Sequence, residues 1–225
     1  MLSLTAILTE FAHAQESYPS VTPTATYIND DGAEVEATTD FAGQAPLAVT
    51  FRANPQNMED YSPVYEWHFK RSDEETEMMV RYEEDTQYTF TESGTTRVTL
   101  KVYLNDKGEQ LDSTVFNVTV SESKLVFPNA FSPNGDDRNP TFKAKEYQSI
   151  VEFHAYIFNR WGQKLYEWTD PAGEWDGTYH GKVVRDGTYF LLVKARGADG
   201  RKYNIRKDVN VLTGFTEREQ TSQNP

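Results

Sequence analysis

The sequence predicts an all-β protein made of two tandem immunoglobulin-like β-sandwich domains. Apolar and polar residues alternate with period two along most of the chain after residue 23, which is typical of half-buried strands. Aromatic residues make up 13% of the 225 residues, with 13 Tyr and 13 Phe, and such side chains suit strands that pack over thin cores. Turn residues separate the alternating runs at regular intervals, as in β-sandwiches.

The first domain is expected over residues 24–122. In the run 97–104, Val98, Leu100 and Val102 share one face, and the Asn105–Gly108 segment that follows is typical of a hairpin turn. Trp67, in the middle of an alternating run, is the expected core anchor. The other strand-like runs are 46–51, 64–69, 79–82, 87–90 and 113–120.

The second domain is expected over residues 124–213, with strand-like runs at 151–158, 163–168, 187–195 and 205–212. A break in charge marks the boundary. Up to Ser123 the chain has 7 Lys and Arg against 22 Asp and Glu, whereas the remainder has 15 against 13. The acidic first half disfavours nucleic acid and anionic membranes as partners.

The ends of the chain carry their own signals. Residues 1–14 combine a short apolar run with Ala12-His13-Ala14, which fits a small-x-small cleavage site and predicts a signal peptide. No cationic segment precedes the run, so the true start could lie upstream, and the alternative is a short amphipathic helix. Residues 15–23 are expected to be a linker and residues 214–225 a polar tail. No stretch approaches the roughly 20 apolar residues that span a bilayer.

The first domain resembles a PKD domain. Its segments Pro46–Phe51, Tyr65–Phe69 and Tyr88–Val102 carry the resemblance, although Lys70-Arg71-Ser72 stands where the family has a Gly-Asp loop. Domains of this family serve mostly as spacers or as interaction modules on cell surfaces. The resemblance therefore implies a location rather than a chemistry.

The second domain resembles the gliding-motility-associated C-terminal domain, the type B C-terminal signal of the Bacteroidetes type IX secretion system. Four segments in fixed order carry the resemblance: Phe127–Asp136, Ile157–Gly162, Trp175–Tyr179 and Asp186–Phe190. The family implies export across the outer membrane, with an SprF/PorP-like outer-membrane protein and other type IX components as partners. It also implies association with the outer membrane, at its periplasmic face or at the cell surface.

Two groups of side chains are candidate sites. Asn134, Asp136, Asp137 and Asn139 offer oxygen ligands within six residues, which suits a weak Ca²⁺ site. The favoured alternative is a loop whose Asn and Asp side chains cap their own backbone, because EF-hand spacing is absent.

Partner-binding candidates are the side chains of two turn-like segments. Trp161 and Trp175 could be exposed aromatic platforms, although anchoring in the core is the favoured interpretation for both. A hairpin corner could still turn Arg160 toward a partner. The full candidate set is Asn159, Arg160, Trp161, Trp175 and Asp176.

These features predict a non-enzymatic protein without a cofactor. The chain has no cysteine, no paired histidine ligands and no nucleophile or phosphate-loop motif. The predicted function is that of a component of the type IX secretion or gliding machinery, docked through its C-terminal domain. The alternative is a surface adhesin or glycan-binding protein exported by the same route.

Overall fold

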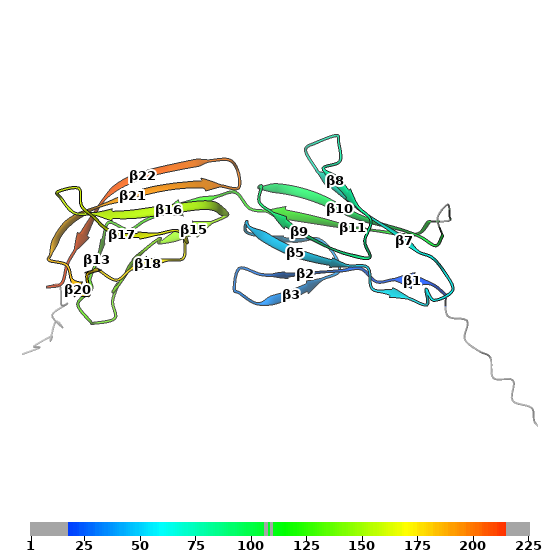
Figure 1. Cartoon of the computed structure of the whole chain (residues 1–225), viewed down its shortest axis with the longest axis horizontal. Helices are drawn as coiled ribbons and strands as arrows, with labels where there is room; N and C mark the ends of the chain where they lie inside the picture. The colour runs from blue at the N-terminus through cyan, green and yellow to red at the C-terminus, as the bar shows by residue number, and fades with distance from the viewer. Residues whose placement is uncertain (1–17, 106–107, 109, 215–225) are drawn as a thin grey trace, which may run out of the picture.

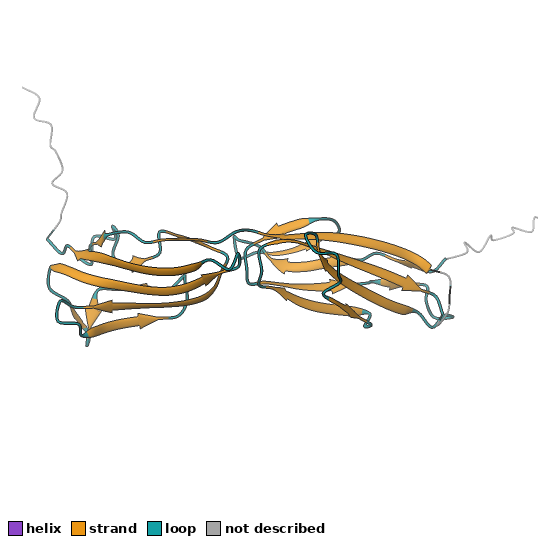
Figure 2. Ribbon diagram, turned by 90° about the horizontal axis from the view of Figure 1, so that it is seen from above, coloured by secondary structure: helices purple, strands orange, loops and turns teal. Residues whose placement is uncertain are grey.

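The computed structural model describes residues 18–105, 108 and 110–214. Two all-β domains lie end to end along the long axis of the molecule (Figures 1 and 2). The described residues contain no helix, and hence none that could span a membrane. The proposed signal peptide and nearly all of the polar tail lie outside the described residues.

The N-terminal domain is a sandwich of two sheets. One has the order β4-β11-β10-β7-β8, the other has the order β3-β2-β5-β9, and β1 pairs with β6 alone. The strands are β1 (Ser20–Val21), β2 (Thr24–Ile28), β3 (Glu34–Ala37), β4 (Phe41–Gly43), β5 (Leu47–Arg52), β6 (Pro55–Gln56), β7 (Val64–Arg71), β8 (Met79–Arg81), β9 (Asp85–Phe90), β10 (Gly94–Tyr103) and β11 (Gln110–Val120).

Alternation along these strands builds the core between the sheets, as the sequence predicts. Trp67 is fully buried, and its ring lies 5.6 Å from that of Phe51 on the opposite sheet. Its indole Nε1 donates to the carbonyl oxygen of Glu83 at 3.0 Å, so the one polar atom of the ring is satisfied. The expected linker over 15–23 is partly wrong, because Val21 in β1 is buried in this core.

The C-terminal domain has one large sheet, of order β13-β22-β21-β16-β17. Three two-stranded ladders, β12-β15, β14-β18 and β19-β20, make up the rest. The strands are β12 (Lys124–Val126), β13 (Ala130–Phe131), β14 (Phe142–Lys143), β15 (Glu146–Gln148), β16 (Ile150–Phe158), β17 (Lys164–Trp168), β18 (Glu174–Trp175), β19 (Thr178–Tyr179), β20 (Lys182–Val183), β21 (Gly187–Gly197) and β22 (Lys202–Val211).

In this domain short ladders stand in place of a second continuous sheet. Pro128, Pro133 and Pro140 lie in the segment that would form it, and proline has no N–H to donate to a strand ladder. Packing of buried aromatic side chains stabilises this part of the domain in place of strand pairing, and Phe142 and Trp175 are fully buried.

The two domains are joined on both sides of the connecting segment. The Oγ of Ser149 accepts from the amide of Ala45 at 3.2 Å and bonds the Oγ of Ser121 at 2.8 Å. On the other side, the amide of Ser93 donates to the carbonyl oxygen of Ala198 at 3.0 Å. Ala198 lies in the hairpin between β21 and β22, yet it packs into the core of the N-terminal domain.

Candidate functional site

The outer face of the large C-terminal sheet carries a strip of apolar side chains. Because Ala155, Ile157, Leu191 and Val193 point into the core, their neighbours along β16 and β21 must point outward. The strand register aligns these outward residues across the sheet. The first row is Phe158, Phe190 and Asp208, and the second is Tyr156, Leu192 and Arg206. The strip consists of the four apolar and aromatic members of these rows, and the two charged members lie at its β22 side.

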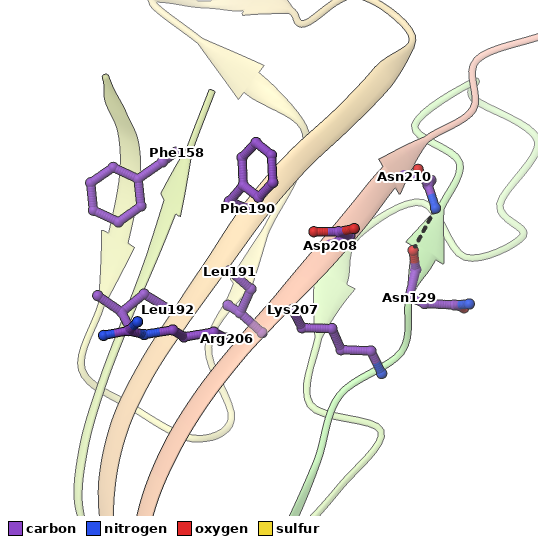
Figure 3. A pocket seen from close by; sticks show the side chains of 9 residues that line it. All are labelled: Asn129, Phe158, Phe190, Leu191, Leu192, Arg206, Lys207, Asp208 and Asn210. Carbon is purple, nitrogen blue, oxygen red and sulfur yellow. Dashed lines mark hydrogen bonds between the residues drawn. The ribbon is translucent and has the colours of Figure 1, made fainter. Parts of the chain in front are cut away.

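The strip borders a shallow depression of about 800 Å³ (Figure 3). The side chain of Phe190 is 42% exposed, a large fraction for a phenylalanine. On the far side of the depression, Nδ2 of Asn210 donates to the carbonyl oxygen of Asn129 at 3.4 Å, and Nζ of Lys207 donates to the carbonyl oxygen of Phe127 at 2.6 Å. These two bonds tie β22 to the segment before β13 and stiffen that edge.

Aromatic rings continue the strip along β16. The rings of His154 and Tyr156 stack with centroids 4.2 Å apart, and those of Tyr156 and Phe158 are 6.1 Å apart. Nζ of Lys164, on the neighbouring β17, lies 5.8 Å from the centre of the Tyr156 ring, a cation–π distance. The face therefore combines apolar rings with cations, the side-chain types enriched at protein interfaces.

Some basic side chains around the strip are paired with carboxylates and others are not. Arg196 is bonded to Glu152 at 2.7 Å, and this bond holds the pKa of the Glu152 carboxyl below its ordinary value. Lys194, Lys202 and Arg206 also lie on the outer face, and none of them forms an ion pair with a residue in the described ranges. The surface around the strip is consequently net positive.

The hairpin between β16 and β17 presents Trp161 to solvent. Oδ1 of Asn159 accepts from the amides of Trp161 and Gln163, each at 3.0 Å, and Gly162 takes the positive φ of 77° that closes the turn. The Trp161 side chain is 78% exposed, and the Arg160 guanidinium lies 4.7 Å from its ring centre. Core anchoring, the favoured interpretation for this residue, is wrong.

Trp175 is fully buried, so it is not an exposed platform. Its ring lies 5.3 Å from that of Phe131, and its Nε1 donates to the carbonyl oxygen of Thr178 at 2.9 Å. The neighbouring Asp176 accepts from the amide of Thr178 at 2.8 Å and thereby closes the turn. For Trp175 the structure thus agrees with the interpretation as a core anchor, and only Asn159, Arg160 and Trp161 of the candidate set lie together at the surface hairpin.

The Asn134–Asn139 loop is built from hydrogen bonds between its own residues. Oδ1 of Asn134 accepts from the amide of Asp136 at 3.1 Å, and Oδ1 of Asp136 accepts from the amide of Arg138 at 2.9 Å. The Asn134 side-chain amide, which also bonds Asp136, is the main cause of the lowered pKa of the Asp136 carboxyl. Asp137 and Asn139 take positive φ angles of 60° and 47°. The loop is therefore of the Asx-turn kind favoured over a calcium site.

Sequence reasoning missed the residues of the outer face, Tyr156, Phe158, Phe190, Leu192 and Arg206. The signal was present in the runs 151–158 and 187–195, where apolar residues occupy both strand faces instead of one. A strand that is apolar on both faces is either covered on both sides or carries a surface that another molecule covers.

The C-terminal domain matches a known family. Residues 125–208 fit the family model of the CHU_C type IX secretion signal domain. The match agrees with the resemblance carried by the four sequence segments. It supports an exported protein that interacts with the type IX secretion machinery.

Other comparisons are more distant. No curated protein matches the chain. Among solved structures, the Bacteroides ovatus mixed-linkage glucan utilization locus protein SGBP-B has 16% identity and a TM-score of 0.32 over 88% of this chain, which spans only 48% of that protein. The FN1–FN3 domains of chicken CNTN1 have 9% identity over 79% of this chain and 68% of theirs, with a TM-score of 0.29. Dimeric latent PorU from Porphyromonas gingivalis has 13% identity over 86% of this chain and 20% of its own, with a TM-score of 0.24.

Proposed function

We propose that this protein is a non-enzymatic component of the type IX secretion or gliding machinery that docks to an SprF/PorP-like outer-membrane protein. The docking surface is the outer face of β16, β21 and β22. The observation that carries the proposal is the aromatic strip with cations beside it, on a domain that matches a secretion signal family. Figure 3 shows Phe158, Phe190 and Arg206 of this surface. The location that follows is the outer membrane, at its periplasmic face or at the cell surface.

The chemistry of the face suits a protein partner. A few buried aromatic and arginine side chains usually provide most of the binding energy of an interface, surrounded by polar contacts that exclude water. Phe158 and Phe190 would form that centre, since they lie opposite each other in the strand register. Arg206 and Lys194 would steer an acidic partner toward the face before contact.

The hairpin residues extend this surface. Arg160 and Trp161 are at the end of β16, beyond Phe158, and their stacked side chains project into solvent. An exposed tryptophan held by a rigid turn loses little conformational freedom on binding. The N-terminal domain, PKD-like in its sequence, would then be the module that the docked domain presents to other parts of the machine.

Affinity capture from outer membranes tests the docking proposal. The tagged full-length protein should recover an SprF/PorP-like barrel, and Phe190→Asp should reduce recovery by about 30-fold, because it places a charge at the centre of the interface. Thr99→Asp is the matched control, since Thr99 faces outward at the middle of β10 in the other large sheet. Equal recovery with both variants, or no barrel in the wild-type sample, contradicts the proposal.

A second candidate function is glycan binding by an exported surface protein. The observation that favours it is a cleft between the two domains with Ile28 and Tyr147 exposed along its walls. Glycan binding and barrel docking involve different surfaces, so the two functions are compatible with each other.

A further inference from the structure

The cleft between the domains has a volume of about 540 Å³. One wall comes from the N-terminal domain, from the end of β2 with Asn29 and Asp30 and from the segment Gln44–Ala48. The other wall comes from Tyr147 in β15 of the C-terminal domain. Clefts at domain boundaries are preferred sites for small ligands.

Hydrogen bonds across the junction hold the two walls in place. Ala45 is part of the first wall, and its amide donates to Oγ of Ser149, two residues beyond Tyr147. That same Oγ bonds Ser121 in the connecting segment, whose amide donates to the carbonyl oxygen of Gly43. The cleft is therefore formed before any ligand arrives, so a ligand does not have to supply the free energy of ordering it.

Turn geometry sets the position of Asp30. Oδ1 of the preceding Asn29 accepts from the amide of Asp31 at 3.1 Å and from the amide of Ala33 at 2.9 Å. This pattern fixes the start of the β2–β3 hairpin and leaves the carboxylate of Asp30 exposed beside the cleft. Gln44, half-buried in the same wall, contributes a side-chain amide that both donates and accepts.

The lining selects a chemical class of ligand. None of the described side chains that line the cleft is a lysine or arginine, and Glu34 is paired across the strands with Ile28, so phosphates and acidic polymers are disfavoured. Tyr147, 45% exposed, offers an aromatic face, while Asp30 and Gln44 offer acceptors and donors for hydroxyl groups. An aromatic face beside carboxylate and amide groups is the chemistry that recognises a neutral sugar.

We propose that this interdomain cleft binds a neutral oligosaccharide. Tyr147 stacks against one face of a sugar ring, and Asp30 and Gln44 bond the hydroxyl groups at its edge. Because the walls belong to different domains, the site exists only in the two-domain protein. The inference rests on export, which brings the protein to glycans, and it is independent of docking to a barrel.

Calorimetric titration of the purified full chain tests the site. The probes are the neutral hexasaccharides of β-1,3-glucose, β-1,4-glucose, β-1,4-xylose, β-1,4-mannose and α-1,4-glucose, with an oligogalacturonate as the acidic comparison. At least one neutral probe should bind, and the oligogalacturonate should not. Failure of every neutral probe at millimolar concentration overturns the proposal, and it does so without affecting the capture experiment on barrel docking.

Variants on the two walls complete the test. Tyr147→Ala should weaken binding at least about tenfold by removing the stacking face, and Asp30→Asn should weaken it about fivefold. Tyr82→Ala is the matched control, because Tyr82 is 69% exposed in the N-terminal domain and does not line the cleft. Binding that survives Tyr147→Ala, or that falls equally with Tyr82→Ala, overturns an interdomain site.

Discussion

The two large sheets share a strand arrangement but differ on their outer faces. In both, a short edge strand (β4 or β13) runs parallel to the last strand of the domain (β11 or β22). Two further antiparallel strands and a second edge strand complete each sheet. The central strand β10 of the N-terminal sheet turns Arg97, Thr99 and Lys101 outward. Its counterpart β21 turns Phe190 and Leu192 outward.

This difference shows that the outer aromatic strip is not a requirement of the fold. The N-terminal sheet is built in the same order with a polar outer face, which is the ordinary solution for a sheet exposed to water. Exposed phenylalanine on the second sheet gains no stability from contact with solvent, and the proposed docking role would use it. The four predictions below test the contrast, from the largest expected effect to the smallest.

Two of the three tryptophans of the C-terminal domain, Trp161 and Trp175, should respond oppositely to truncation. Trp175→Ala should lower the free energy of unfolding by about 3–5 kcal/mol, because the side chain is fully buried among other rings. Trp161→Ala should change it by less than about 0.5 kcal/mol, because the ring faces solvent. Denaturant unfolding followed by circular dichroism measures both values, and similar losses would mean that Trp161 packs against the domain.

Two turn glycines allow a second paired test. Gly177→Ala should cost about 2–3 kcal/mol, because φ is 78° and a Cβ atom would lie 2.9 Å from Cγ of Pro133. Gly162→Ala, with nearly the same φ and open space around it, should cost only about 1 kcal/mol. Thermal unfolding of the two variants measures both losses of stability. Equal losses would show that the close approach of the new Cβ atom to Pro133 does not destabilise the domain.

Charge reversal on corresponding faces tests the role of the cations. Arg206→Glu should weaken capture of the outer-membrane partner about fivefold at low salt, because it removes an attractive cation beside the strip. Arg97→Glu on the N-terminal sheet should leave capture unchanged. Raising the salt concentration should shrink the difference between wild type and Arg206→Glu, since salt screens exposed charges. A difference independent of salt argues against electrostatic steering.

Lowering the pH should destabilise both domains, because each contains an aspartate whose carboxylate accepts hydrogen bonds. Asp40 accepts from the side chain and backbone amides of Asn117, and Asp186 accepts from the hydroxyl and amide of Thr213. These bonds hold the pKa of each carboxyl below its ordinary value of 3.8. Their stabilising contribution is therefore complete above about pH 4 and is lost as the pH falls through the lowered pKa.

Carboxyl NMR titration checks this directly. Both side chains should titrate below the ordinary aspartate range, and Asp40→Asn or Asp186→Asn should reduce the acid sensitivity of the melting temperature of its own domain. Titration of either carboxyl at its ordinary pKa would show that its hydrogen bonds do not persist in solution.

The amino-acid sequence by itself determined the longer strands and the burial of Trp67. Period-two alternation has a local physical cause, because successive side chains on a strand point to opposite faces. The resemblance of the second domain to a secretion signal was likewise readable from four short segments, and the family match over residues 125–208 supports it.

Tertiary structure alone decided which tryptophan is buried and where the domains touch. Trp161 and Trp175 both lie near turn glycines, so their local patterns are alike. Rings from distant segments, Phe131 and Tyr189 among them, pack on Trp175 and bury it. The bond between Ala45 and Ser149 joins residues 104 positions apart, which no local pattern encodes. Contacts between segments far apart in the chain depend on how whole domains pack, and so the cleft emerged only in three dimensions.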